Sequence, residues 1–124
     1  MKQPVNTSNA PAPIGPFSQA ITCGGMIYVS GQLPIDPATG EMPDDISTQA
    51  HLVMRNIAAI VEAAGSRMDS LIKTTILLTD LGHFAQVNEV YAQYVGKVPP
   101  ARACYQVCAL PKGAQVEIEA VCAL

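Results

Sequence analysis

The residues of this chain best suited to chemistry are one arginine and two glutamates in its last quarter. Arg102 lies in the segment Pro100–Cys104, and Glu117 and Glu119 lie in Val116–Ala120. Both segments otherwise read as apolar, alternating β-strands. A charged side chain in such a strand is costly to desolvate, so it is normally retained for a partner or a bound anion. Arg102 is therefore a candidate receptor for a carboxylate or a phosphate.

Structural roles compete with these functional ones. Arg102 could form an ion pair with Glu117 or Glu119 of a neighbouring subunit, and the two glutamates could form a solvated face. Asn88 stands on an apolar helical stripe and needs hydrogen-bond partners, which either a neighbouring loop or a ligand could supply. Ser30 precedes a glycine at a strand end, where turns and binding sites both occur.

Other kinds of catalytic site are not indicated. The sequence has no Ser-His-Asp or Cys-His arrangement and no phosphate-binding glycine loop. Cys104 and Cys108 do not have a zinc spacing, and His51 and His83 fall on predicted helices without a ligand-spaced neighbour. We expect no metal. The four cysteines, which we expect to be buried, reduced thiols, are Cys23, Cys104, Cys108 and Cys122.

Composition sets bounds on the class of protein. The 124 residues, 13.0 kDa, fit one domain over 1–124. A hydrophobic fraction of 49% with only 14% charged residues is more than one small monomer can bury, so we expect an oligomer. The net charge of −3 and the lack of a Lys/Arg cluster argue against nucleic acid as a partner. With no apolar signal or membrane-spanning run, we expect a cytoplasmic protein without a membrane partner.

Periodicity places two helices among several strands. Four prolines keep the first sixteen residues extended and irregular, with room for a short strand. Alternation predicts a hairpin of 17–23 and 26–30 around Gly24-Gly25. Apolar residues at helical spacing predict a helix from Ile46 to about Ala64, with Asp44 or Asp45 at its start. The other expected elements are a strand over 71–79 covered on both faces, a helix over about 82–95, and strands over 101–109 and 115–123.

This order is typical of an α+β layer with two helices on one face of a single mixed sheet. The other face has no helices to cover it. The sequence therefore predicts that subunits pack sheet against sheet, and a closed ring follows from such packing. Residues expected on the uncovered strand faces include Cys104, Gln106, Cys108, Glu117, Glu119 and Val121.

Strand alternation also predicts which side chains share a face. On 101–109, Arg102 and Cys104 share the semi-polar face, and Ala103 and Tyr105 share the core face. If the last two strands formed a simple hairpin, Arg102 would lie about five positions from Glu117, on the order of 16 Å. The two could then meet only across a subunit boundary or through a non-adjacent strand order.

Seven ordered motifs span almost the whole chain, and these are Ile14–Ala20, Val29–Pro34, Ala63–Gly65, Lys73–Thr75, Phe84–Tyr91, Pro100–Arg102 and Val116–Ala120. Together they resemble the Rid, or YjgF-like, family of reactive intermediate deaminases. The resemblance implies a chorismate-mutase-like fold and a homotrimer whose sheets form a central barrel with ligand clefts between subunits. It also implies hydrolysis of 2-imino or enamine acids, such as 2-iminobutanoate and 2-iminopropanoate, to a 2-keto acid and ammonia.

The resemblance also assigns roles to residues. Arg102 would hold the substrate carboxylate by a two-point contact. Glu117 would position or activate the attacking water, and the backbone of Cys104 would contact the imine nitrogen or that water. Ser30, Gly31 and Asn88 would shape the pocket. No cofactor is implied, because an iminium carbon is already electrophilic.

Three features differ from the usual family pattern. Phe17 stands where a tyrosine is usual, so one hydroxyl near the substrate or the water is absent. Cys108 stands where a small residue without a thiol is usual. The segment between Tyr94 and Pro99 is shorter, which would change the rim of the cleft. A non-catalytic trimer that binds small acids, as a metabolite sensor or chaperone-like protein, is the alternative function, and an RNA-cleaving role is disfavoured by the acidic balance.

Overall fold

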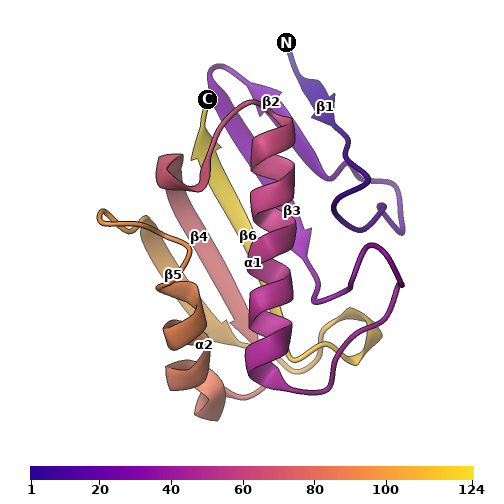
Figure 1. The fold of residues 1–124 in the computed structure, drawn as a ribbon, viewed down its shortest axis with the longest axis vertical. Helices are drawn as coiled ribbons and strands as arrows, with labels where there is room; N and C mark the ends of the chain where they lie inside the picture. Colours follow the sequence, from indigo (N-terminus) through magenta and orange to yellow (C-terminus); the bar gives the residue numbers. More distant parts are fainter.

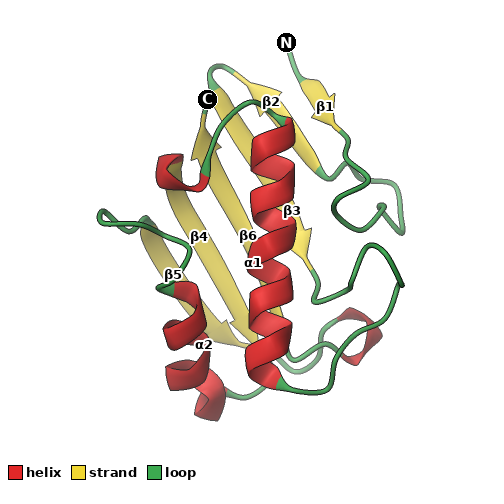
Figure 2. Ribbon diagram, in the orientation of Figure 1, coloured by secondary structure: helices red, strands yellow, loops and turns green.

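Six β-strands and two α-helices make up the computed structural model, which describes residues 1–124 (Figures 1 and 2). The strands are β1 (Gln3–Val5), β2 (Ala20–Cys23), β3 (Met26–Gln32), β4 (Leu71–Leu78), β5 (Ala101–Gln106) and β6 (Val116–Ala123), and the helices are α1 (Ile46–Ala63) and α2 (Phe84–Tyr91). Short 3-10 turns cover Met68–Ser70, Leu81–His83 and Pro111–Gly113. The predicted α+β class and the β2–β3 hairpin are confirmed.

All six strands belong to one mixed sheet in the order β1-β2-β3-β6-β4-β5. Neighbouring strands are antiparallel except β4 and β5, which are parallel. Both helices lie on the same side of this sheet, with α1 across its centre and α2 beside β4 and β5 (Figure 1). The predicted two-layer arrangement is therefore correct.

The long helix α1 follows the boundaries that its sequence predicts. The carboxylate of Asp45 caps the first turn by accepting a hydrogen bond of 2.9 Å from the backbone nitrogen of Thr48. After the last turn the chain leaves through Gly65, whose φ of 88° favours glycine. The apolar stripe between these ends is buried against the sheet and includes Val53, Ile57 and Ile60. This packing forms the centre of the core.

The last two strands do not form a simple hairpin. A parallel pair needs a crossover connection, and α2 is that connection between β4 and β5. β4 therefore separates β5 from β6. The non-adjacent strand order that the sequence left open is the one observed.

The predicted face assignment of β5 was wrong. Arg102 is paired with Thr74 of β4, and Thr74 is paired with Ala120 of β6, so the three side chains share the helix-covered face. Cys104 packs against the core on the same face. Tyr105, which was expected in the core, is 57% exposed on the opposite face. The error arose because an edge strand can place a charged side chain beside a helix without burying it.

Glu117, Glu119 and Val121 lie on the face without helices, as predicted. This face is partly apolar. Tyr28 of β3 is 49% exposed there beside Val121, its pairing partner in β6. β4 was expected to be covered on both faces, but Lys73 is exposed and Thr75 and Leu77 are only half-buried. We call this surface the open sheet face. Within a single chain nothing covers it, and sheet-to-sheet packing between subunits stays a prediction.

The second helix is shorter than predicted. α2 ends at Tyr91, and turns carry the chain from there to Val95, which is buried. No helix of the structure has the length and apolar character needed to cross a bilayer.

Buried amides attach the irregular segments to this frame. The side chain of Gln19 binds the backbone of Thr7, Ala10 and Pro11. On α1, Asn56 is 1% exposed and donates to the carbonyl oxygens of Leu33 and Ile35 at 3.1 and 3.0 Å. These bonds fix both chain segments that flank the β2–β3 hairpin.

Replacement of Asn56 by alanine should destabilise the protein by about 2–4 kcal/mol, because two carbonyl groups at a buried site lose their donor. Urea unfolding at one fixed protein concentration measures the change. Arg55→Ala, an exposed neighbour on the same helix, is the control and should lie within about 0.5 kcal/mol of wild type. Equal midpoints for Asn56→Ala and wild type would contradict this role.

Candidate functional site

Arg102 lies on β5 between two aromatic rings of α2. Its guanidinium carbon is 5.4 Å from the ring centre of Phe84 and 5.2 Å from that of Tyr91. Nη1 donates a 2.7 Å hydrogen bond to Oδ1 of Asn88. A cation over aromatic faces is attracted by their quadrupoles, and the amide bond fixes its rotation. The guanidinium is therefore oriented while most of its donors remain free.

The side chain of Tyr91 is held by strand β4. Its hydroxyl lies 2.5 Å from Oγ1 of Thr74, which is 1% exposed and is the pairing partner of Arg102 on β4. Burial raises the pKa of Tyr91, while Thr74 and Arg102 act in the opposite direction. The ring that supports the cation is thus anchored to the neighbouring strand. The helical period of about 82–95 predicts that Phe84, Asn88 and Tyr91 share one face of a helix, but it does not identify them as a support for Arg102.

A cavity of about 510 Å³ opens beside this cation. It lies between the end of α2, the segment 95–100 and the start of β5, and both Arg102 and Asn88 line it. No carboxylate lines it, and the one ion pair of the chain, Arg67 with Asp69, is elsewhere. Arg102 does not pair with Glu117 or Glu119 within the chain. We call this place the cation half-site.

A second cluster lies where β3 meets β6. Pairing is regular up to Val29 and shifts before Gln32, so the chain bulges at Ser30-Gly31. The carboxylate of Glu117 rests against the bulge, because a Cβ atom added to Gly31 would overlap its Oε2 and lie 2.9 Å from its Cδ. Only glycine allows this approach without displacing the carboxylate. We call this place the carboxylate half-site.

The environment of Glu117 favours a retained proton. Partial burial raises the pKa of its carboxyl group, and the negative charge of Glu119 raises it further. Because no cation lies beside it in the chain, nothing lowers the pKa again. A carboxyl group in this state can exchange protons closer to neutral pH than an exposed glutamate can.

Phe17 and Ser30 belong to the carboxylate half-site. Ser30 uses its hydroxyl to donate a 2.6 Å hydrogen bond to the carbonyl oxygen of Ser18, which fixes the loop that carries Phe17. Phe17 is 48% exposed, and with Gly31 it lines a small cavity of about 40 Å³. Ser30 is therefore not in a turn: it lies within β3 at the bulge, where its hydroxyl makes a structural bond next to the candidate site.

Cys104 lies near Arg102 and faces the helix layer. Burial raises the pKa of its thiol, and Arg102 acts in the opposite direction. A raised pKa keeps the thiol neutral, so its side chain is not an activated nucleophile. The expectation of buried thiols holds for Cys122 but was wrong for Cys23 and Cys108, which are exposed.

The two half-sites cannot act together on one small molecule within one chain. Gly31 is on β3 and Arg102 is on β5, so three strand spacings, on the order of 14 Å, separate them. Arg102 faces the helices, whereas Glu117 faces the open sheet face. The residues that the resemblance groups into one pocket are therefore divided between the centre of the sheet, at β3 and β6, and its β5 edge.

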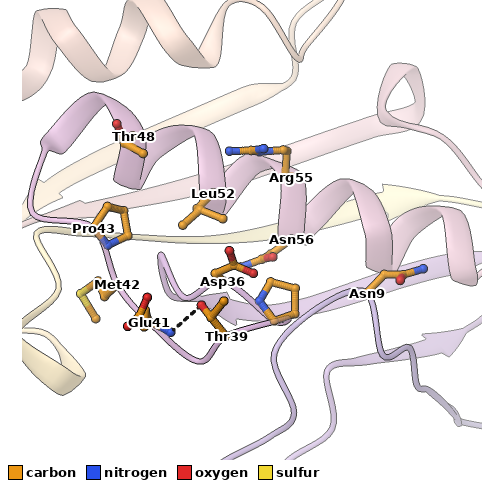
Figure 3. Close-up of a pocket in the computed structure, with 11 residues that line it drawn as sticks. Asn9, Asp36, Thr39, Glu41, Met42, Pro43, Thr48, Leu52, Arg55 and Asn56 are labelled. Carbon is orange, nitrogen blue, oxygen red and sulfur yellow. Dashed lines mark hydrogen bonds between the residues drawn. The ribbon is translucent and has the colours of Figure 1, made fainter.

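A third cavity, larger than the two described above, contains none of these residues. It measures about 820 Å³ and lies between the 36–43 loop and α1, where Figure 3 shows Asp36, Glu41 and Arg55 around it. The loop is closed on itself, for example by the Glu41 backbone nitrogen donating to Oγ1 of Thr39 at 3.2 Å. Most of the residues that line it are polar, but neither Arg102 nor Glu117 is among them, so the candidate site lies elsewhere. No cluster of three or more His, Cys, Asp or Glu side chains suited to a metal ion occurs in the structure.

Glu117→Gln should stabilise the folded protein at neutral pH. Folding raises the pKa of this carboxyl group above the ordinary glutamate value of 4.5, so the folded state keeps the proton to a higher pH than the unfolded state does. The folded protein therefore loses stability as the pH rises above 4.5. The gain should therefore be present near pH 8 and vanish below about pH 4. Urea unfolding across this range measures it.

Glu119→Gln provides the comparison for that experiment. It removes only the neighbouring charge, so the pKa of Glu117 should fall part of the way and the gain in stability at neutral pH should be smaller. A Glu117→Gln variant no more stable than wild type at pH 8 would contradict the raised pKa.

Known proteins resemble this chain over nearly its whole length. The family model described as Endoribonuclease L-PSP matches residues 7–124. The RutC family protein y4sK of Sinorhizobium fredii is 54% identical, over 100% of this chain and 99% of its own length. A Bos taurus protein named 2-iminobutanoate/2-iminopropanoate deaminase is 48% identical, over 94% of this chain and 86% of its own.

A solved structure shows the same fold at similar identity. The crystal structure of a conserved Rid family protein from Yersinia pestis matches with a TM-score of 0.97 and 46% identity, covering 100% of both chains. The family model and these relatives extend over nearly all of the chain. The chain therefore belongs to the Rid, or YjgF-like, family.

Proposed function

We propose that the protein is a hydrolase that converts reactive 2-imino and enamine acids to 2-keto acids and ammonia. The observation that carries this proposal is Arg102, a cation oriented by Phe84, Tyr91 and Asn88 with free donors facing a cavity that has no carboxylate. A guanidinium in this state suits the carboxylate of a 2-imino acid. The name of the bovine relative suggests 2-iminobutanoate and 2-iminopropanoate as substrates.

The complete site lies between two subunits of a homotrimer in this proposal. One chain supplies the cation half-site and its neighbour supplies the carboxylate half-site, since the two are too far apart within one chain. The partly apolar open sheet face supports such an assembly, because its exposed side chains gain cover when sheets pack together. Three sheets would then form a central barrel with three equivalent sites at the interfaces.

The chemistry needs a placed water and a route for protons. Arg102 holds the substrate carboxylate, and Glu117 accepts a proton from water as the water oxygen bonds to the imine carbon. The carbon–nitrogen double bond becomes a single bond in this step. Glu117 returns this proton to the nitrogen, which completes a carbinolamine with one hydroxyl and one amino group. Glu117 then carries the hydroxyl proton to the amino nitrogen, the carbonyl double bond forms as the carbon–nitrogen bond breaks, and the 2-keto acid and ammonia leave.

The remaining candidates have supporting roles. The backbone of Cys104 contacts the imine nitrogen or the water, and its neutral thiol takes no part in bond making. Ser30 and Gly31 shape the wall that holds Glu117, and Asn88 orients Arg102. The iminium carbon is already electrophilic, so these groups suffice without a cofactor.

A second function is favoured by Phe17. This ring lines the carboxylate half-site without the hydroxyl that a tyrosine would supply, which reduces the donors available to a substrate or water. A trimer that binds small acids without turnover, as a sensor or a chaperone-like protein, would retain Arg102 and tolerate that loss. RNA cleavage is less favoured, because the net charge is −3 and no basic cluster occurs in the sequence.

Arg102→Ala should abolish hydrolysis of freshly generated 2-iminobutanoate, because the substrate loses its carboxylate receptor. Ammonia release measures turnover, and the wild-type protein should exceed the spontaneous rate. Light scattering is the control for assembly and should give roughly 39 kDa, three times 13.0 kDa, for both proteins. Near-normal turnover by a trimeric Arg102→Ala variant would assign Arg102 a structural role, and a monomeric wild type would contradict the shared site.

Phe17→Tyr should raise turnover of 2-iminopropanoate and 2-iminobutanoate about tenfold, the effect of one added hydrogen bond to a charged group. The ring is half exposed, so the extra oxygen needs little repacking. Wild type and variant are compared at one protein concentration after both are shown to be trimers. A folded, trimeric variant that is no faster on either substrate would favour the sensor over the deaminase.

A further inference from the structure

The cation half-site contains a second positive charge. Lys97 lines the same cavity of about 510 Å³ as Arg102. It makes no ion pair in the chain, and no aspartate or glutamate lines the cavity. The chain has only 7 lysines and arginines against 10 acidic residues, so two unpaired cations at one cavity differ from the overall balance of charge.

The three residues before Lys97 are held in place by the rest of the chain. The hydroxyl of Tyr94 lies 2.9 Å from Nδ1 of His51 on α1, and Val95 is 5% exposed. Gly96 has a φ of 72°, and Oδ1 of Asp69 lies 2.8 Å from the point where a Cβ atom would be. These contacts hold the backbone of Lys97 at the rim, although its ammonium group is exposed.

We infer that Lys97 selects substrates with a second carboxylate at the end of the side chain, a step that rests on the proposed deaminase function. Arg102 binds the carboxylate next to the imine, and Lys97 binds the terminal one. Cavities of roughly 300–1,000 Å³ hold drug-sized ligands, so the space admits a side chain longer than that of 2-iminobutanoate. The substrate class is therefore dicarboxylic 2-imino acids.

The expected size of the preference is modest, because Lys97 is exposed. An ion pair in water-like surroundings changes affinity by about fivefold, and partial exclusion of water by the bound ligand increases this effect. The attraction is also screened by salt. A preference that depends on Lys97 should therefore be largest at low ionic strength.

Binding of keto-acid products tests the inference on the full chain. 2-Oxoglutarate and 2-oxopentanoate have the same carbon chain and differ in the terminal carboxylate. Calorimetry at low salt should show about fivefold tighter binding of 2-oxoglutarate by wild type. Lys97→Gln should make the two affinities equal, and Lys97→Glu should reverse the preference.

Lys2→Glu is the matched control. It makes the same change in net charge as Lys97→Glu, but beside β1, at the opposite edge of the sheet from β5. It should leave the ratio of the two affinities unchanged. Rates of ammonia release from the imines of glutamate and of 2-aminopentanoate should follow the same order in each variant. Raising the salt concentration should reduce the difference in wild type but not in Lys97→Gln.

The outcomes separate the two proposals. If wild type hydrolyses imines but binds both keto acids equally, or if Lys97→Gln keeps the wild-type ratio, the role of Lys97 is overturned and the deaminase function stands. If wild type accelerates ammonia release from neither class of imine, the deaminase function fails and this inference fails with it.

Discussion

The parallel pairing of β5 with β4 is the constraint on which the arrangement of this protein depends. It requires a crossover, and α2 is that crossover, so the helix that connects the two strands also supplies the rings and the amide around Arg102. The same pairing moves β5 to the edge of the sheet, away from Glu117. One topological choice thus both creates the support for the cation and separates it from the carboxylate.

The two half-sites are built by different physical means. Around Arg102, aromatic faces and one neutral amide orient the charge without neutralising it, so the guanidinium remains available to an anion. Around Glu117, the close approach of a glycine removes water, and a neighbouring glutamate opposes ionisation. The surroundings of Arg102 leave its positive charge free, whereas those of Glu117 oppose the formation of a negative charge. Such a difference is what a reaction that binds an acid and transfers protons requires.

Sequence patterns predicted the elements well because their causes are local. The cap at Asp45, the apolar stripe of α1 and the glycine turn of the β2–β3 hairpin each involve residues close in sequence. The faces of β5 were assigned wrongly, since alternation fixes which residues share a face but not which face meets the helices. The cost of a charge in an apolar strand indicated Arg102 and Glu117, and the resemblance to a family added their roles and Gly31. The bond of Thr74 to Tyr91 joins segments that no local pattern connects.

The division of the site has a consequence for how activity depends on the amount of protein. In the proposed trimer every chain carries both halves, yet an isolated chain has no complete site. Mass action then governs catalysis, since dilution below the dissociation range removes sites without unfolding or damaging any chain. In that trimer the open sheet face holds the chains together, so its packing would determine the concentration at which the protein begins to act.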